Sequence, residues 1–440
     1  MSIFLRYYEH IITLCSFYMD LRTKIKAVYR QLKYFYKMKI AIIGGGAAGF
    51  FSALSIKQHF PNHEVIILEK TTKVLAKVKI SGGGRCNVTF DQRNSIELSK
   101  HYPRGENYLK KAFDIFGVGD TFNWFSERGV DLKVYPDGCV FPVANDSQVI
   151  IDCFMREASR LNIKIEYQAA VQAIRLDQDK FILETREKNY QFDKVIITSG
   201  GQPKKSGMDW LEKLGHAIVD PVPSLFTFNM PGNPITALMG NVVEKAVVKV
   251  EGTKLVGKGP LLITHWGMSG PAILLLSAWG ARVLNEKEYK FAVLVNWLND
   301  QKENELHEVI STVIATQGGK MMGNLNPFPI SNRLWHFLLQ KCALSLELRW
   351  QDLGSKSINK IISVLINDRY EVSGKTTFKE EFVTAGGIAL KDVDIRTMES
   401  KIIPGLHFAG EVLDIDGITG GYNFQAAWTT GFIAGKGVGE

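Results

Sequence analysis

The sequence is poor in cysteine. Its 440 residues contain only five cysteines, an odd number, and no two of them have C-x-x-C spacing. A structural zinc site needs closely spaced cysteine and histidine ligands, and scattered thiols are typical of a reducing compartment. We therefore expect no metal site and a cytoplasmic protein. The five are Cys15, Cys86, Cys139, Cys153 and Cys342.

Long hydrophobic runs are also missing. The longest apolar window near the start covers residues 11–19, whereas a membrane-spanning helix needs about 20 residues. No small-residue cleavage site follows this window, so we expect neither a membrane span nor a secretory signal. Residues 1–37 mix aromatic and basic side chains. One hypothesis is that Met38 is the physiological start, and the alternative is that 1–37 is an amphipathic anchor on a membrane surface.

The excess of positive charge is concentrated at one end. Of the net +8, residues 1–37 carry +5, from seven basic and two acidic side chains, which leaves 8 − 5 = +3 for the rest. This small excess favours a small-molecule substrate and no nucleic-acid partner. A chain of 440 residues with 45% hydrophobic content is typical of two or three globular domains. The sequence carries no signal for an oligomeric state.

Residues 39–49 read KIAIIGGGAAG, a continuous apolar run that ends in glycines. Gly44, Gly46 and Gly49 have G-x-G-x-x-G spacing, which predicts a buried parallel strand, a tight turn and a helix whose N-terminus binds a pyrophosphate. Glu69 ends a second apolar run 69 − 49 = 20 residues later, where a carboxylate can bind ribose hydroxyl groups. Together the two signals predict a dinucleotide site.

A second glycine-rich segment, residues 77–87, follows directly. Its three successive glycines allow the backbone to approach a flat or phosphorylated ligand, and Arg85 can supply charge. Cys86 could be redox-active, but without a C-x-x-C partner we favour a buried or cofactor-packing thiol.

Three later segments repeat the pattern of an apolar strand followed by glycine. Residues 192–201 predict a strand beside the first one. Residues 384–388 and 405–411 repeat the pattern, and the second of these runs ends in Gly410 and Glu411. Gly420–Asn423 then open an apolar helix over 424–435. The N-terminus of that helix is suited to the electron-rich edge of a flavin ring. Two distant segments at the ends of one extended ligand indicate FAD rather than NAD alone.

The region between these segments has a different sequence pattern. Alternating residues over 242–264 predict antiparallel strands, residues 301–354 predict helices, and Ser357–Val372 predict strands again. Residues 107–130 predict one helix. We expect an α/β protein: an FAD-binding, Rossmann-like doubly wound domain with an inserted small β domain that contains a small helical subdomain. The predicted units are the extension 1–37, the FAD-binding parts 38–200 and 377–440, the β-domain parts 201–297 and 355–376, and the helical insert 298–354.

The chain resembles the BaiN/RdsA-type family of FAD-dependent, NAD(P)-linked oxidoreductases, also called aminoacetone-oxidase-like FAD-binding enzymes, with the glutathione-reductase-type FAD fold. The resemblance covers residues 38–440 and rests on Ile43–Gly49, Lys79–Asn87, Val140–Pro142, Thr264–Leu274 and Thr384–Gly435. It implies that the inserted β domain is a β-barrel domain and that Val171 offers backbone to adenine. Thr198–Gly201 departs mildly from the usual Ala-Thr-Gly-Gly, and Cys139 replaces a larger polar residue.

The motifs and the resemblance together give one predicted cofactor set. It comprises Gly44, Gly46, Ala47, Ala48, Gly49, Glu69, Lys70, Gly83, Arg85, Cys86, Asn87, Val171, Ser199, Gly200, Gly410, Glu411, Asp414, Gly420, Gly421, Tyr422 and Asn423. Asp416 lies in the same loop as Asp414, and both could orient a ligand or cap turns.

The expected chemistry is hydride transfer, which requires little of the protein beyond position, exclusion of water and one proton donor. His265 is a candidate donor, although a capping or packing role is at least equally compatible with its place. Only one dinucleotide fingerprint is present, so NAD(P)H must bind transiently at the flavin. We expect reduction of a small unsaturated or keto compound; the alternatives are an amine or amino-ketone oxidase, a flavoprotein of tRNA modification and a non-catalytic flavin-binding protein.

Overall fold

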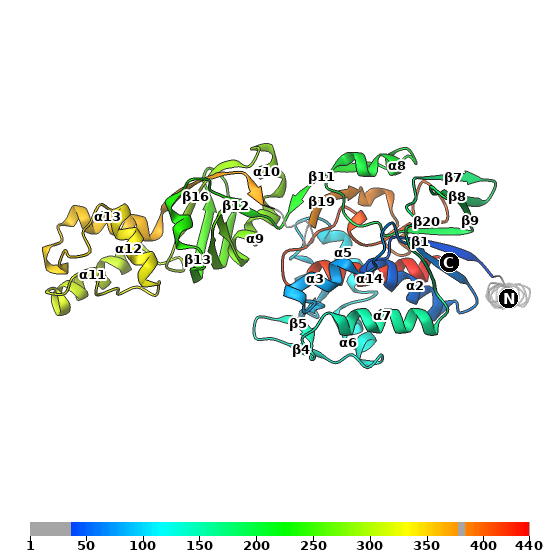
Figure 1. The fold of residues 1–440 in the computed structure, drawn as a ribbon, viewed down its shortest axis with the longest axis horizontal. Coiled ribbons are helices and arrows are strands. Elements are labelled where there is room, and N and C mark those ends of the chain that lie inside the picture. Colours follow the sequence, from blue (N-terminus) through cyan, green and yellow to red (C-terminus); the bar gives the residue numbers. More distant parts are fainter. Residues whose placement is uncertain (1–36, 377–382, 440) are drawn as a thin grey trace, which may run out of the picture.

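The computed structural model describes residues 37–376 and 383–439, which form a large α/β body and a narrower extension on one side of it (Figure 1). The two hypotheses about residues 1–37 fall almost wholly on positions outside the described residues.

A five-stranded parallel sheet is the centre of the large body. Its strand order is β20-β10-β1-β2-β6, and every neighbouring pair is parallel. The predicted return strand does lie beside the first one, with Ile197 opposite Ile43. The strands are β1 Lys39–Ile43, β2 Glu64–Leu68, β6 Lys164–Glu166, β10 Lys194–Ile197 and β20 Leu406–Phe408.

The first and last helices of the body pack closely. A Cβ atom on Gly431 of α14 (Tyr422–Gly437) would lie 2.9 Å from Ala48 O of α2 (Ala47–His59), and one on Gly435 would lie 2.5 Å from Ser52 O. From the first contact to the second, both helices advance by four residues in the same direction, so the two helices run parallel. Helix α14 starts about two turns, roughly 12 Å, before the start of α2.

Shorter elements complete the large body. The helix expected over 107–130 is in fact two helices, because the chain breaks around Gly117, whose N–H bonds to Asp120 Oδ2 at the start of α6. The remaining elements are α3 Ala76–Gly84, α4 Ser95–Ser99, α5 Glu106–Phe113, α6 Val118–Ser126, α7 Gln148–Arg160, α8 Asp209–Glu212, β3 Thr89–Phe90, β4 Leu132–Val134, β5 Cys139–Pro142, β7 Ala173–Asp177, β8 Lys180–Glu184 and β9 Asn189–Phe192.

The extension begins with a seven-stranded antiparallel sheet in the order β17-β16-β13-β14-β15-β12-β18. Its two edge strands are consecutive in the chain and separated only by Gly374, whose carbonyl accepts from Asn229 N–H at 3.1 Å. The sheet is therefore closed on itself like a barrel. Its elements are β12 Thr227–Asn229, β13 Val242–Val250, β14 Val256–Thr264, β15 Gly267–Ser269, β16 Lys290–Asn296, β17 Asp368–Ser373, β18 Lys375–Thr376, α9 Pro271–Trp279 and α10 Ala281–Glu286.

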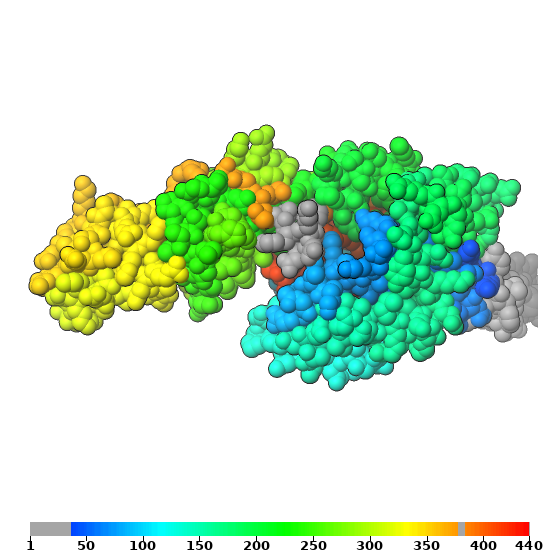
Figure 2. All heavy atoms as spheres, viewed as in Figure 1, coloured from blue at the N-terminus to red at the C-terminus, as the bar shows by residue number. Residues whose placement is uncertain are grey.

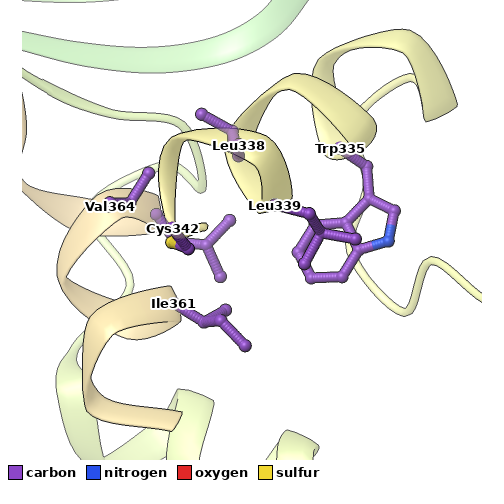
Figure 3. Close-up of a pocket in the computed structure, with 7 residues that line it drawn as sticks. Trp335, Leu338, Leu339, Cys342, Ile361 and Val364 are labelled. Atoms are coloured by element: carbon purple, nitrogen blue, oxygen red, sulfur yellow. The ribbon is translucent and has the colours of Figure 1, made fainter. Parts of the chain in front are cut away.

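Three helices form the far end of the extension: α11 Glu303–Gln317, α12 Asn332–Lys341 and α13 Ser355–Ile366 (Figure 1). The strand predicted from Ser357 is wrong as far as Ile366, because the chain there is the helix α13. Ile358, Ile361, Ile362 and Leu365 follow helical spacing and face the other helices. Figure 3 shows the crevice between α12 and α13, which is lined by Trp335, Cys342 and Ile361 among others and is too narrow for a water molecule.

The chain passes between the large body and the β-barrel domain in β11 (Ile218–Ser224) and β19 (Val383–Ile388), which pair with each other. Each side has its own hydrophobic core. In the part of the chain that the structure describes, a separate apolar cluster at this junction contains only Val222, Ala281 and Ala385. The two masses are also distinct in the space-filling view (Figure 2).

Candidate active site

The predicted phosphate turn lies between β1 and α2. Gly44 has φ +114°, and a Cβ there would lie 2.5 Å from Thr198 O, so only glycine fits. A Cβ on Gly49 would lie 2.0 Å from Gly44 O, which explains how closely helix and strand pack. Gly46, by contrast, has nothing within 4 Å of an added Cβ. The middle glycine therefore faces open space, where a ligand can approach the backbone.

Helix α2 offers its N-terminus to that space. Gly46 is the N-cap, and no acidic side chain lies in the first turn, where Ala47 and Ala48 leave backbone N–H groups for an anion. This arrangement suits a pyrophosphate.

Glu69 is fixed beside the same turn. Its Oε2 accepts from Gly45 N–H at 2.9 Å, and its Oε1 accepts from Thr71 N–H at 2.8 Å and Thr71 Oγ1 at 2.9 Å. Lys70 follows it and is exposed, and Val171 lies half-buried against the core of the large body. The backbone around Val171 is close to Glu69, because Ala169 N–H donates to Glu69 O at 2.9 Å.

The second glycine-rich segment interrupts α3. Gly82, Gly83 and Gly84 have φ angles of +58°, +70° and +85°, and an added Cβ on Gly83 or Gly84 would meet nothing within 4 Å. Arg85 stacks over the Phe141 ring at 4.2 Å. Cys86 is fully buried, and burial raises its thiol pKa to about 12. This burial and raised pKa favour the thiol form of Cys86 over the thiolate at neutral pH.

The same segment meets the start of α14. A Cβ on Gly421 would lie 2.7 Å from Asn87 Oδ1 and 2.6 Å from Thr89 O, and Gly420 and Gly421 have φ +124° and +96°. The Tyr422 ring packs on Phe90 with centroids 4.9 Å apart and on His101 at 4.8 Å. The structure therefore joins the predicted residues of 83–87 with those of 420–423.

Asn423 closes the loop before α14. Its Oδ1 accepts from Gly417 N–H at 2.8 Å, and its Nδ2 donates to Gly417 O at 2.9 Å. Tyr102 OH donates to Tyr422 O at 2.6 Å. The N-terminus of α14, like that of α2, has no acidic residue in its first turn. A negatively charged ring edge would be favoured there.

Glu411 connects several distant segments. Its Oε1 accepts from Thr384 N–H at 2.9 Å, and its Oε2 accepts from Lys77 Nζ at 2.6 Å. A Cβ on Gly201 would lie 2.6 Å from Glu411 Oε1. Gly410 has φ +77°, and its N–H donates to Thr430 Oγ1 at 2.9 Å.

The strand-end residues Ser199 and Gly200 lie next to the phosphate turn. An added Cβ on Gly44 would lie 3.2 Å from Ser199 Cα, whereas Gly200 has φ +74° and open space around its Cβ position. Ser199 therefore lies beside the turn between β1 and α2.

Asp416 is held by a residue that sequence reasoning missed. Arg104 makes a two-pronged ion pair with the Asp416 carboxylate, and Arg104 Nη1 donates to Ala278 O at 2.8 Å. Burial raises the pKa of Asp416 above its ordinary value, and Arg104 opposes that shift. No local signal marks Arg104, since its partners are far away in the sequence. Asp414, its neighbour in the loop, lies half-buried and has a carboxyl pKa that burial also raises.

His265 lies in the turn between β14 and β15. Its side chain is exposed, and its ring packs against Trp266 with centroids 4.2 Å apart. Within 37–376 and 383–439, no recorded contact joins His265 to the predicted cofactor residues. Its role as a proton donor stays a prediction.

No group of three or more His, Cys, Asp and Glu side chains among the described residues could hold a metal ion. No described helix is long and apolar enough to cross a membrane.

The site fits FAD on three observations. An added Cβ at Gly46, Gly83 or Gly200 would meet nothing within 4 Å, and neither α2 nor α14 has an acidic residue in its first turn. Glu69 and Glu411 are each held by N–H donors from other segments. The offset of about 12 Å between the starts of α2 and α14 suits an extended dinucleotide more than a compact ligand.

The family model described as "HI0933-like protein Rossmann domain" matches residues 38–437. The chain belongs to this family. Its relatives include a 3-dehydro-bile acid delta(4,6)-reductase from Clostridium scindens, 27% identical over 91% of this chain and 99% of that protein. A ribosomal RNA dihydrouridine synthase from Escherichia coli is 26% identical over 90% of this chain and 96% of that protein. Among solved structures, the open conformation of a flavocytochrome c3 fumarate reductase aligns with a TM-score of 0.47 and 16% identity, covering 92% of this chain and 78% of that one.

Proposed function

We propose that this protein uses NAD(P)H to reduce a carbon–carbon double bond conjugated with a carbonyl group. The chain is an FAD-dependent oxidoreductase. Bound FAD supplies the hydride chemistry. The single observation that carries the proposal is the pair of parallel helices α2 and α14, whose N-termini lack acidic residues and start about 12 Å apart, in a chain with only one dinucleotide fingerprint.

The predicted cofactor residues would each bind a different part of FAD. The N-terminus of α2 and Gly46 would hold the pyrophosphate, and Glu69 would bind ribose hydroxyl groups. Glu411 would bind the polyol chain between the two ends. Gly420–Asn423 and the N-terminus of α14 would favour negative charge on the ring.

The substrate class is supported by the names of two relatives. Delta(4,6) reduction of a 3-keto bile acid and formation of dihydrouridine are the same kind of reaction, since each adds hydrogen across a double bond conjugated with a carbonyl. The proposal therefore names this shared chemistry. A small molecule is the favoured substrate, because residues 38–440 carry a net charge of only +3.

Ribosomal RNA is the second candidate substrate, and the 96% coverage of the Escherichia coli relative favours it. The two substrates are distinguished by supplying NADH or NADPH with either a 3-keto-4-ene steroid or unmodified ribosomal RNA. The product is then analysed by mass spectrometry for the gain of two hydrogen atoms. Reduction of the steroid supports the favoured substrate, and reduction of uridine only in the RNA supports the second.

The remaining alternatives predict other outcomes. An amine or amino-ketone oxidase would reduce its flavin with the substrate itself and consume oxygen without NAD(P)H. A non-catalytic flavin-binding protein would reduce neither acceptor and would consume no oxygen. Failure of both acceptors, with NAD(P)H unconsumed, would contradict the proposed function.

A further inference from the structure

Arg104 occupies the junction between the large body and the β-barrel domain. It precedes α5 in the large body, and its side chain is only 14% exposed. Its guanidinium group bonds to both carboxylate oxygens of Asp416, to Ala278 O at 2.8 Å and to Ser224 Oγ at 3.4 Å. One side chain therefore contacts the C-terminal loop, the linker strand β11 and helix α9.

The contact with Ala278 completes the end of α9. The last carbonyl groups of a helix have no partners within the helix, and positive charge is favoured at that end. Helix α9 has no basic residue in its own last turn. Arg104, from the other domain, supplies the missing charge and a hydrogen-bond donor.

The linker is tied to the same helix end. Phe226 N–H donates to Ser277 Oγ at 3.0 Å, and Ser224 Oγ donates to Asp416 Oδ2 at 2.8 Å. The separate apolar cluster at the junction comprises only Val222, Ala281 and Ala385 among the described residues. Because so little apolar surface meets there, the polar contacts of Arg104 must contribute much of the orientation of the β-barrel domain.

Asp416 connects this junction to the proposed FAD site. The loop Asp414–Gly417 lies between Glu411 and α14, and Gly417 exchanges two hydrogen bonds with the side chain of Asn423. On one side the loop is fixed by Asn423, and on the other by Arg104. An ordered ring-binding end therefore favours an ordered Asp416, and Asp416 orients Arg104.

We infer that Arg104 is a positioning residue that couples occupation of the FAD site to the orientation of the β-barrel domain. The inference rests on the proposed FAD site.

The test is amide hydrogen exchange of the full-length protein with and without FAD. In the natural protein, FAD should slow exchange in 218–224 and 271–280 by about tenfold. Arg104→Gln should remove this FAD-dependent protection while leaving exchange in β1 and α2 unchanged. Arg104→Lys keeps the charge but loses the fork of donors, and it should retain part of the protection.

Arg128→Gln is the matched control. Arg128 is 15% exposed, close to the value for Arg104, but its partners Trp124, Glu127 and Glu157 all belong to the large body. It should behave like the natural protein at 271–280. Equal protection in Arg104→Gln and Arg128→Gln, or no effect of FAD at 271–280 in the natural protein, would overturn the inference.

A second variant keeps the inference testable if Arg104→Gln does not fold. Ser224→Ala removes the linker contact and leaves the Arg104–Asp416 pair in place, and it should reduce FAD-dependent protection in 218–224 by a few-fold. Unchanged protection there would contradict the inference. Reduction of the bound flavin by NAD(P)H is measured separately. If flavin reduction fails but the exchange pattern is as expected, the proposed reductase activity is wrong and the coupling stands.

Discussion

Lys77 Nζ donates to Glu411 Oε2 at 2.6 Å, although 334 residues separate them in the sequence. The pair joins the start of the second glycine-rich segment to the acid at the end of β20. Since Glu411 also accepts from Thr384 N–H at 2.9 Å, its carboxylate is fixed by two donors before any ligand binds. Preorganisation of this kind lowers the entropic cost of holding a ligand.

Replacing Glu411 should therefore weaken FAD binding. Glu411→Ala is expected to raise the FAD dissociation constant at least about tenfold, because the proposed contact between a preorganised carboxylate and a polyol hydroxyl is lost. Lys77→Gln should have a smaller effect, since the Lys77 side chain is 48% exposed and exposed ion pairs contribute little. Quenching of flavin fluorescence measures both constants. A larger effect from Lys77→Gln than from Glu411→Ala would contradict this ordering.

A substitution at Gly46 should weaken FAD binding without preventing folding. Its φ of −93° is accessible to any residue, and an added Cβ meets nothing within 4 Å, so Gly46→Val should fold. The branched side chain would nevertheless occupy the space proposed for the pyrophosphate. We expect a loss of FAD affinity of at least about tenfold with the melting temperature of the FAD-free protein unchanged within a few degrees.

Two controls apply to the Gly46 variant. Gly44→Ala should fail to fold or melt much earlier, because its Cβ would lie 2.5 Å from Thr198 O. Gly119→Ala, in open space on α6, should change neither property. Normal FAD affinity in Gly46→Val would place the pyrophosphate elsewhere.

Asp368 is the centre of a buried network between the β-barrel domain and the helical insert. Its carboxylate accepts from Trp297 Nε1 at 3.1 Å, from Tyr370 OH and from Lys341 Nζ. Asp368→Ala leaves these donors unpaired and should lower the free energy of unfolding by about 3 kcal/mol. Asp300, paired with Lys258 on the surface, is the matched control, and Asp300→Ala should change stability by less than about 0.5 kcal/mol. Denaturant titration compares them, and equal losses would contradict the role of burial.

His407 predicts a pH dependence of stability. It is fully buried on β20, and burial lowers its pKa to about 4 from an ordinary value of 6.5. Between these values the unfolded chain binds a proton that the folded chain does not. Stability should therefore fall as pH drops from about 6.5 to 4, by about 3 kcal/mol in total from this group, and then level off.

The matched variant is His407→Gln, whose amide can keep the hydrogen bond that Nδ1 makes to Thr397 O at 3.0 Å. Denaturant titrations at pH 7, 5.5 and 4.5 should show a steeper loss in the natural protein than in the variant. Parallel pH profiles would show that His407 does not titrate in this range.

Local pattern was sufficient to predict the strand, turn and helix of residues 39–59. The spacing of Gly44, Gly46 and Gly49 requires only a strand, a turn and a helix, which sequence neighbours specify, and Glu69 follows at the expected place. The same holds for the apolar strands that end in glycine. These elements form because their own residues favour them.

Long-range contacts and β-branched helices escaped prediction. The run Ser357–Ile366 is rich in isoleucine, which favours strands by composition, but its apolar residues follow a helical repeat and pack against α11 and α12. Arg104 carries no local signal, because its meaning depends on Asp416 and Ala278 in distant elements. The roles of the predicted cofactor residues and the domain limits stay predictions.

The most direct test of the central claim is anaerobic. The purified protein should show the visible spectrum of an oxidised flavin. Addition of NADH or NADPH, in separate experiments, should bleach the flavin absorbance within the time of one catalytic turnover. Bleaching by either nucleotide is the predicted result for a nicotinamide-driven reductase. A bound flavin that neither nucleotide reduces would contradict the proposed electron donor, and a protein that binds no flavin even after reconstitution would contradict the account as a whole.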